Sequence, residues 1–208
     1  MENRCRILDA AARVYAEFGF RGATTRRIAQ AAGVNEVTLF RTFGSKDALI
    51  AEALHHHATV ESRAMRALPD RPAHPERELT AWATAELADL REHRTLIRKT
   101  MSEIEERPDL APTVTAGWQA CDMALHAYTG RLREAGFLDP AIPDDDVFAA
   151  GAMLLGALFG DAMGRDVLPA LYPQPAESAP AVYVRLFLRS IACRAAAPDA
   201  HPQLAPTP

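Results

Sequence analysis

Apolar residues recur at intervals of three and four along most of the 208-residue chain, which is the spacing of one face of an α-helix. In residues 3–18 the repeating positions are Ile7, Leu8, Ala11, Ala12, Val14, Tyr15 and Phe18. Glycine or proline interrupts the pattern between such stretches, as expected where helices end. The pattern predicts an all-α protein with helices over residues 3–18, 45–68, 76–92, 94–106, 110–135, 145–167 and 179–196.

Residues 24–44 predict two further, short helices joined by a tight turn. Thr24 and Thr25 can cap the first of them, and Gly33 can adopt the left-handed conformation that ends it. Gly44 ends the second helix, and Ser45 caps the helix that follows. The second helix has an apolar side with Val34, Leu39 and Phe43 and a polar side with Asn35, Glu36, Thr38, Arg41 and Thr42. Two short helices in this arrangement are typical of a helix-turn-helix, whose second helix reads DNA.

The same stretch resembles a known family. Residues 24–46 read TTRRIAQAAGVNEVTLFRTFGSK, which is similar to the start of tetracycline-repressor (TetR/AcrR) family transcription regulators. The matching positions are Thr24–Thr25, Ile28–Ala29, Ala32–Gly33–Val34, Thr38–Leu39, Phe43, Ser45–Lys46 and Leu49. They are numerous, ordered and correctly spaced, whereas the rest of the chain resembles the family in length and helical character.

Four positions depart from the family pattern. Asn35 and Val37 replace its usual Ser and Gly, Phe40 replaces Tyr, and Thr42 replaces His. In the family the Tyr hydroxyl and the His ring commonly bind phosphates. Arg41 is a candidate to compensate, because a guanidinium can bind phosphate or guanine with two hydrogen bonds.

The resemblance implies a domain organisation. Residues 1–47 are expected to form a three-helix DNA-binding domain of the helix-turn-helix type, and residues 48–196 a larger helical domain for ligand binding and dimerisation. Residues 197–208, which are rich in proline, are expected to be disordered.

Candidate DNA contacts follow from the motif. We expect Thr25 and Lys46, at helix starts, to bind phosphates. On the second helix Arg41 can pair with guanine and Glu36 with cytosine, and Val37 can touch a thymine methyl group. The full candidate set is Thr24, Thr25, Arg26, Arg27, Asn35, Glu36, Val37, Thr38, Phe40, Arg41, Thr42 and Lys46. The alternative is an ordinary solvated helix face.

Charge is unevenly distributed. The net charge is −4, which by itself argues against a nucleic-acid partner. Residues 1–47, however, carry eight basic and five acidic side chains, whereas the remainder carries 15 basic and 22 acidic ones. A basic end on an acidic body fits local contact with phosphates, although ordinary scatter in composition is the alternative.

Two segments near the end of the chain are candidates for a dimer interface. Gly156, Gly160 and Gly164 recur every four residues, which makes a flat stripe that another helix can approach closely. Residues 145–167 and 179–196 resemble the helix pairs that form four-helix dimer interfaces in the family. Candidate contacts are Gly156, Phe159, Gly160, Tyr183 and Phe187. The alternative is that both helices cover the core of a single chain.

The resemblance also implies a small, often apolar effector bound between the helices of the larger domain. Candidate lining residues, which combine bulk with a few polar groups, are Trp82, Met101, Trp118, Cys121, Met123, His126 and Tyr128. Each of them is alternatively a plain core residue.

Other chemistry has weak support. Three cysteines, an odd number without metal-like spacing, are expected to be free thiols in a reducing cytoplasm. The charged N-terminus does not resemble a signal peptide, and the apolar run 147–160 is shorter than the ~20 residues that a membrane span needs. His55–His57 point about 100° apart in a helix and cannot converge on one ion. Asp144–Asp146 suit a helix start, with a Ca²⁺ loop as the alternative.

No enzyme signature is present. The sequence has no glycine-rich phosphate loop, HExxH or GxSxG motif, and the pair Asp122 and His126 lacks a third partner. The sequence predicts no catalysis, metal or cofactor. Its favoured interpretation is a cytoplasmic homodimeric repressor that binds a palindromic double-stranded DNA operator and is released by a small molecule, with no membrane partner. The alternative is a helical sensor or adaptor that has lost specific DNA binding, a hypothesis based on Phe40 and Thr42.

Overall fold

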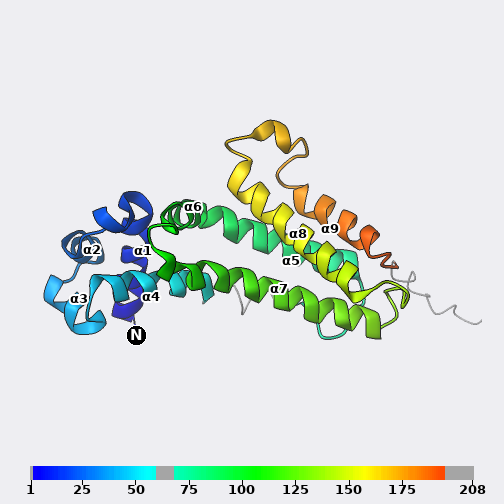
Figure 1. Ribbon diagram of the computed structural model, residues 1–208, viewed down its shortest axis with the longest axis horizontal. Helices are drawn as coiled ribbons and strands as arrows, with labels where there is room; N and C mark the ends of the chain where they lie inside the picture. Colours follow the sequence, from blue (N-terminus) through cyan, green and yellow to red (C-terminus); the bar gives the residue numbers. More distant parts are fainter. Residues whose placement is uncertain (1, 60–67, 195–208) are drawn as a thin grey trace, which may run out of the picture.

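The computed structural model describes residues 2–59 and 68–194, which form helices joined by turns and contain no strand. The all-α prediction is therefore confirmed. The elements in chain order are α1 (Glu2–Gly22), α2 (Thr25–Ala32), α3 (Glu36–Phe43), α4 (Lys46–Thr59), α5 (Pro75–Glu92), α6 (Arg94–Glu103), η1 (Pro108–Leu110), α7 (Ala111–Glu134), α8 (Asp144–Gly164), η2 (Pro169–Leu171) and α9 (Ala179–Ser190). Figure 1 shows an elongated molecule with α1–α4, here called the head, at one end and α5–α9, the body, extending from it.

The head has its own hydrophobic core. Ile7, Ala11 and Tyr15 of α1 are buried among residues of α2, α3 and α4, so α1 provides the surface on which the short helices pack. Short helices need such packing because they are marginal alone. From α4, Leu49, Ile50, Ala53 and Leu54 join this core. Ala48 is exposed, since Leu49 and Ile50 take the inward positions.

Glycines end the helices of the head. Gly33 caps α2 in the left-handed conformation with φ 64° and ψ 37°, as predicted. Gly44 ends α3, also as predicted, but with φ 78° and ψ −49° it lies outside the left-handed helical region. Gly19 was predicted to end the first helix; it breaks α1 with φ 67° and ψ −179°, and a further helical turn then continues to Gly22. The predicted end of the fourth helix at residue 68 involves residues 60–67, which lie outside the described part of the chain, as does the predicted tail 197–208.

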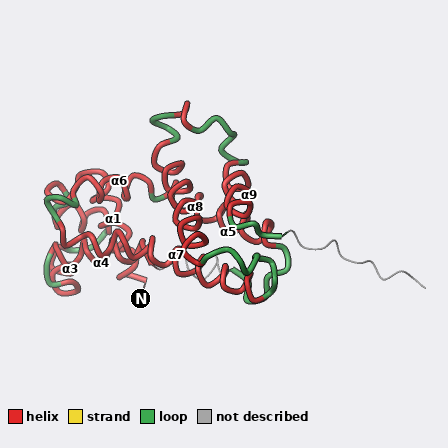
Figure 2. The backbone as a smooth tube through the Cα atoms, turned by 45° about the vertical axis from the view of Figure 1, so that its right-hand side comes forward, coloured by secondary structure: helices red, strands yellow, loops and turns green. Residues whose placement is uncertain are grey.

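The body is a second core. Leu79 and Trp82 of α5, Leu125 and Tyr128 of α7, and apolar residues of α8 and α9 form one buried cluster. Figure 2 shows the same helices packed side by side, with the connection between α8 and α9 projecting beyond them. Asp144, Asp145 and Asp146 occupy the first turn of α8, and Gly136 follows α7 with φ 77°. The position of the three aspartates matches the prediction of a helix start.

Three helix ends in the body differ from the predictions, and the first is that of α8, which ends at Gly164 rather than 167. Helix α6 ends at Glu103 rather than near 106, and Pro108 begins a separate 3₁₀ turn. Helix α9 ends at Ser190 rather than 196, because Ala192 takes a left-handed φ of 43° and Arg194 N–H donates to the Phe137 carbonyl (2.8 Å). The contact between Arg194 and Phe137 joins residues far apart in the chain, so the local sequence gives no signal for it.

Helix α8 is, by length and composition alone, apolar enough to cross a membrane, a test that the core helix of a soluble protein also passes. Its residues Val147, Leu154, Leu155 and Leu158 are buried in the body core. The glycine stripe on this helix was expected to receive another helix. Within the chain, Tyr172 instead lies across its end, with the hydroxyl 2.7 Å from an ideal Cβ on Gly164 and 3.4 Å from one on Gly160, whereas Gly156 faces open space.

Candidate nucleic-acid interface

The two short helices α2 and α3 each begin at a side-chain cap. Thr24 Oγ1 accepts a hydrogen bond from the Arg27 backbone N–H (3.3 Å) at the start of α2. Asn35 Oδ1 accepts one from the Val37 N–H (2.9 Å) at the start of α3. Asn35, which replaces the family's usual serine, therefore still caps the second helix of the motif.

The outer face of α3 is exposed. Val37 is 70% and Phe40 49% exposed, and Arg41 lies beside them at helical spacing, whereas Leu39 is buried in the head core. Figure 1 places α3 at the extreme end of the head, away from the body. This face carries an aliphatic, an aromatic and a cationic side chain, which can contact methyl groups, bases and phosphates respectively.

Four candidate residues on α2 and α3 interact with one another within the head. The Thr25 hydroxyl donates to the Glu36 carboxylate (2.5 Å) and so ties α2 to α3. The Thr42 hydroxyl donates to the Thr38 carbonyl one turn earlier (2.7 Å). The Thr25 hydroxyl would have to release Glu36 before it could donate its proton to a phosphate, whereas the second carboxylate oxygen of Glu36 is not used in this bond.

The two arginines of α2 differ. Arg27 donates to the Gly22 carbonyl (3.0 Å) and its guanidinium carbon lies 4.3 Å from the centre of the Phe18 ring. Arg26 and Arg41 are exposed. Arg27 is therefore bound to the end of α1, and Arg26 and Arg41 are the more accessible cations.

Lys46 is partly buried at the start of α4. Its Nζ donates to the Phe20 carbonyl (2.9 Å) and lies 3.9 Å from the centre of the Phe20 ring. Arg107, which follows α6, also lies against this ring, with its guanidinium carbon 3.7 Å from the ring centre. No sequence motif marks Phe20, Glu103 or Arg107 as functional; the only local signal is that Phe20 is an aromatic residue directly after a helix-ending glycine.

The residues predicted to line a ligand site do not converge. Trp82, Cys121 and Tyr128 point into the body, where the Cys121 thiol donates to Glu86 (3.2 Å) and the Tyr128 hydroxyl to Glu78. Burial and the neighbouring Glu78 carboxylate raise the pKa of Tyr128. Met101 and Met123 are exposed on the outside, since they fall out of phase with the buried positions of their helices. Trp118 packs edge-on against Phe159, and His126 against Phe148.

The predicted dimer residues also occupy different environments. Phe187 is only 3% exposed and lies in the core of its own chain, as the alternative interpretation of α9 expects. Tyr183 packs against that core and its hydroxyl donates to Asp161 (2.7 Å). Gly160 lies beneath Tyr172, and Gly156 is exposed.

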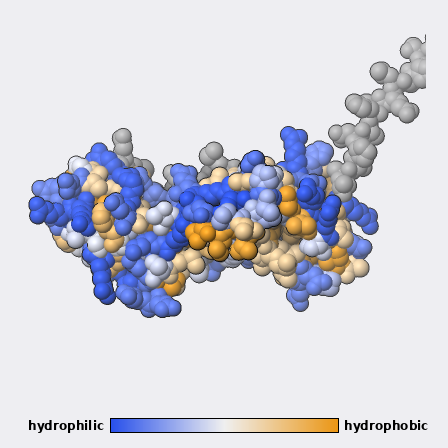
Figure 3. Space-filling model, turned by 90° about the horizontal axis from the view of Figure 1, so that it is seen from above, coloured by the Kyte–Doolittle hydropathy of each residue, from blue (hydrophilic) through white to orange (hydrophobic). Residues whose placement is uncertain are grey.

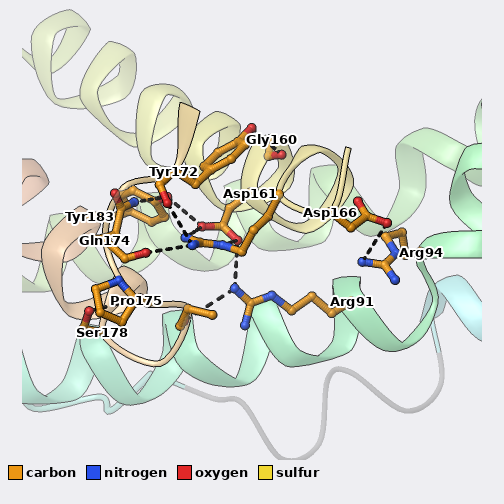
Figure 4. Close-up of polar contacts among 12 residues, drawn as sticks. Arg91, Arg94, Gly160, Asp161, Asp166, Tyr172, Gln174, Pro175, Ser178 and Tyr183 are labelled. Atoms are coloured by element: carbon orange, nitrogen blue, oxygen red, sulfur yellow. Dashed lines mark hydrogen bonds and ion pairs between the residues drawn. The ribbon is translucent and has the colours of Figure 1, made fainter. Parts of the chain in front are cut away.

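A buried carboxylate organises the connection between α8 and α9. Asp161 is fully buried and accepts hydrogen bonds from Arg91 of α5 (2.8 Å), Arg165 (2.9 Å) and Tyr183. Figure 4 shows Arg91 and Tyr183 pointing toward Asp161 from two other helices of the body. Burial alone would raise the pKa of Asp161, but the hydrogen bonds from Arg165, Arg91 and Tyr183 outweigh it and lower the pKa to about 2.

The histidines and aspartates that were considered as metal ligands lie in separate places. His57 Nε2 lies 3.3 Å from Asp9 Oδ1, which places this histidine at the edge of the head core, while His55 is exposed. Asp144 pairs with Arg133 (2.9 Å). Among the described residues no three His, Cys, Asp or Glu side chains are placed to hold a metal ion.

Comparisons with known proteins agree with this geometry. The family model described as bacterial regulatory proteins, tetR family, matches residues 7–53. The HTH-type transcriptional regulator YvkB of Bacillus subtilis is 29% identical over 133 residues, which cover 64% of this chain and 69% of YvkB. An HTH-type transcriptional repressor of Mycobacterium tuberculosis is 48% identical over 46 residues, which cover 22% of this chain and 25% of that protein.

Solved structures extend the likeness through the body. A transcriptional regulator from Rhodococcus sp. RHA1 is 25% identical, with a TM-score of 0.69 and coverage of 91% of this chain and 97% of that one. The TetR family regulator PfmR from Thermus thermophilus is also 25% identical, with a TM-score of 0.61 and coverage of 88% and 97%. Fold and motif together define a helix-turn-helix DNA-binding regulator. Residues 7–53 carry the DNA-binding motif of the TetR family, and the whole chain has the fold of TetR-family transcriptional regulators.

Proposed function

We propose that the protein is a repressor that binds a palindromic double-stranded DNA operator as a homodimer and leaves it when a small, apolar effector binds the body. It acts in the cytoplasm as a binding protein rather than an enzyme. In this proposal residues 1–47 contact DNA, and residues 48–196 bind the effector and form the dimer. The observation that carries the proposal is the exposed face of α3, which presents Val37, Phe40 and Arg41. This helix is capped at both ends.

The apolar surface of the body supports the dimer. Met153 and Gly156 of α8 and Leu186 of α9 are exposed, and no described part of the chain comes within 4 Å of a Cβ on Gly156. Figure 3 shows apolar side chains gathered over the body, while the head end is mainly hydrophilic. Large exposed aliphatic side chains on two adjacent helices favour an isologous interface, in which the same face of each copy meets. Two recognition helices held about 34 Å apart would then read successive major grooves.

The interior of the body supports an effector site. Trp82, Cys121 and Tyr128 bring an indole, a thiol and a phenol from two helices toward the same interior, alongside the buried Glu86. A mostly apolar interior with a few polar groups is typical of a site for a small apolar molecule. Effector binding would shift the body helices relative to the head and so change the separation of the two recognition helices.

The first experiment is selection of bound duplexes from a random DNA pool at moderate salt. The proposal expects an enriched palindrome with half-sites about one helical turn apart. Arg41→Ala should then weaken binding to the selected duplex by about 1–3 kcal/mol and relax specificity at one position. Arg77→Ala, which removes the same charge from the exposed side of α5, is the matched control and should bind like the wild type.

A second candidate function is a sensor or adaptor that no longer binds DNA. It is favoured by Phe40 and Thr42, which lack the phosphate-binding groups of the family, and by the hydrogen bond that occupies Thr25 and Glu36. If no duplex is enriched and wild-type binding to mixed DNA shows no dependence on salt, the adaptor function replaces the repressor function.

A further inference from the structure

The break in α1 at Gly19 leaves the backbone N–H of Phe20 free to bond with a residue of the body. After Gly19, whose φ is 67°, the Phe20 N–H no longer belongs to the hydrogen-bond ladder of α1. It donates instead to both carboxylate oxygens of Glu103, the last residue of α6, at 3.1 and 3.2 Å. This contact joins residues 83 positions apart and connects the head directly to the body.

The contact depends on glycine at position 19. A Cβ at that position would lie 2.3 Å from Glu103 Oε1 and 2.6 Å from the Lys99 side chain. The missing side chain therefore lets the carboxylate reach the backbone, and Lys99 Nζ, 3.6 Å from Glu103 Oε1, balances its charge. The glycine serves both the turn and this close approach.

Phe20 in turn holds Lys46. The Phe20 carbonyl accepts one Lys46 proton, and its ring lies 3.9 Å from the ammonium nitrogen. An ammonium group has three protons, so the remaining ones are available to a phosphate oxygen. The next residue, Asp47, is 3.4 Å from Arg107 Nη2, and the Arg107 guanidinium also lies against the Phe20 ring. The start of α4 is thus held by the segment at the end of α6.

From this geometry we infer that Glu103, a body residue, is a positioning residue for DNA binding: it fixes Phe20, and Phe20 holds the Lys46 ammonium in place for a DNA phosphate. The inference rests on the proposed function, because it takes Lys46 to be a phosphate contact. A lysine held in place beforehand loses less side-chain freedom when it binds DNA, so its contact contributes more affinity. Glu103 itself, being negative, does not touch the DNA.

The test is a double-mutant cycle measured on the duplex selected from the random pool. Glu103→Ala should weaken binding about fivefold, the loss expected when one flexible side chain must be ordered on binding. Lys46→Ala should itself lower the slope of log affinity against log salt concentration by about one. When Lys46 is already Ala, Glu103→Ala should cause no further loss of DNA affinity. Glu103→Gln retains an oxygen acceptor for the Phe20 N–H and should bind within about twofold of the wild type.

Two further variants complete the design. Glu105→Ala removes the same charge from the exposed turn that follows α6 and should leave affinity unchanged. Phe20→Leu keeps the backbone carbonyl but removes the aromatic ring. It should weaken DNA binding about threefold when Lys46 is present, and it should have no effect on binding when Lys46 is replaced by Ala. This variant tests the same path if Glu103→Ala does not fold. Folding of every variant is checked by circular dichroism.

The outcomes separate the inference from the function on which it rests. If the wild type binds no duplex, the proposed function fails. If the wild type binds and Lys46→Ala weakens it, but Glu103→Ala binds like Glu105→Ala, the inference alone is overturned. An equal loss from Glu103→Ala with and without Lys46 also overturns it, because Glu103 would then act only through general stability.

Discussion

Asp161 illustrates how one residue can fix a segment that has little regular structure. The carboxylate is buried, and Arg165, one of its partners, also donates to the carbonyls of Tyr172 (3.2 Å) and Gln174 (2.7 Å). The buried charge is therefore paired and fully hydrogen-bonded, the condition under which such a charge is tolerated. Its contacts hold the connection from α8 to α9 against the body.

We expect Asp161→Asn to lower the free energy of unfolding by about 3 kcal/mol at pH 7, because it leaves Arg91 and Arg165 without their anion. The folded-state pKa of about 2 lies below the value near 3.9 of an unfolded aspartate. The contribution of the ionised Asp161 carboxylate to the free energy of unfolding is therefore complete above pH 4 and is lost as pH falls toward 2. Chemical denaturation of both proteins from pH 7 to pH 2 checks this prediction, and a difference that stays constant below pH 4 would contradict it.

At the scale of elements, the head depends on turns that only glycine adopts easily. The short helix α2 ends at Gly33, whose N–H donates to the Gln30 carbonyl, and the chain then enters α3 within three residues. The tightness of this turn sets the angle between the two helices and therefore the direction in which the face of α3 points.

Gly33→Ala should lower the free energy of unfolding by about 1 kcal/mol, because alanine is strained at φ 64° although a Cβ would meet nothing within 4 Å. The matched control is Gly130→Ala within α7, where a Cβ also meets nothing within 4 Å but the backbone is helical. That change should raise stability by about 0.5–1 kcal/mol. Thermal and urea unfolding of both variants measure the change in the free energy of unfolding. A change of the same sign in both variants would refute the explanation that the positive φ of Gly33 requires glycine.

At the scale of the whole molecule, the head and the body meet through α6 and the residues that follow it. Arg98 of α6 donates to Asp166 (2.6 Å) and to the Met163 carbonyl at the end of α8, while Glu103 at its other end binds Phe20 of the head. One helix therefore contacts both the α8 side of the body and the Phe20 turn of the head. This arrangement gives body and head a direct mechanical connection.

If the protein forms the proposed homodimer through α8 and α9, Met153→Arg should convert that dimer to a monomer without lowering the thermal stability of the chain itself. Met153 is 76% exposed on α8 beside Gly156, so an arginine there disrupts only contacts with another copy. Met123→Arg, at an equally exposed methionine on α7, is the control and should stay dimeric. Sedimentation analysis of the two variants tests the interface, and a dimeric Met153→Arg protein would place it elsewhere.

Helical spacing and short motifs were sufficient to predict the helices, the stops at Gly33 and Gly44, and the family of the DNA-binding motif. These features depend on neighbours within a few residues, which local sequence reports directly. Side-chain direction in the body was less predictable. Met101 and Met123 are as apolar as the buried Leu125, and only the packing of neighbouring helices shows which of them faces outward.

The sequence by itself therefore determined the helical class, the helix-turn-helix and which residues α3 carries, because each rests on short-range periodicity and capping. Only the tertiary structure decided that Lys46 is held by Phe20, that Glu103 reaches the break after Gly19, and that Tyr172 rather than a helix covers Gly160 and Gly164. These contacts join residues far apart in the chain. Their existence depends on how two hydrophobic cores pack and where the helices between them end, which no local pattern encodes.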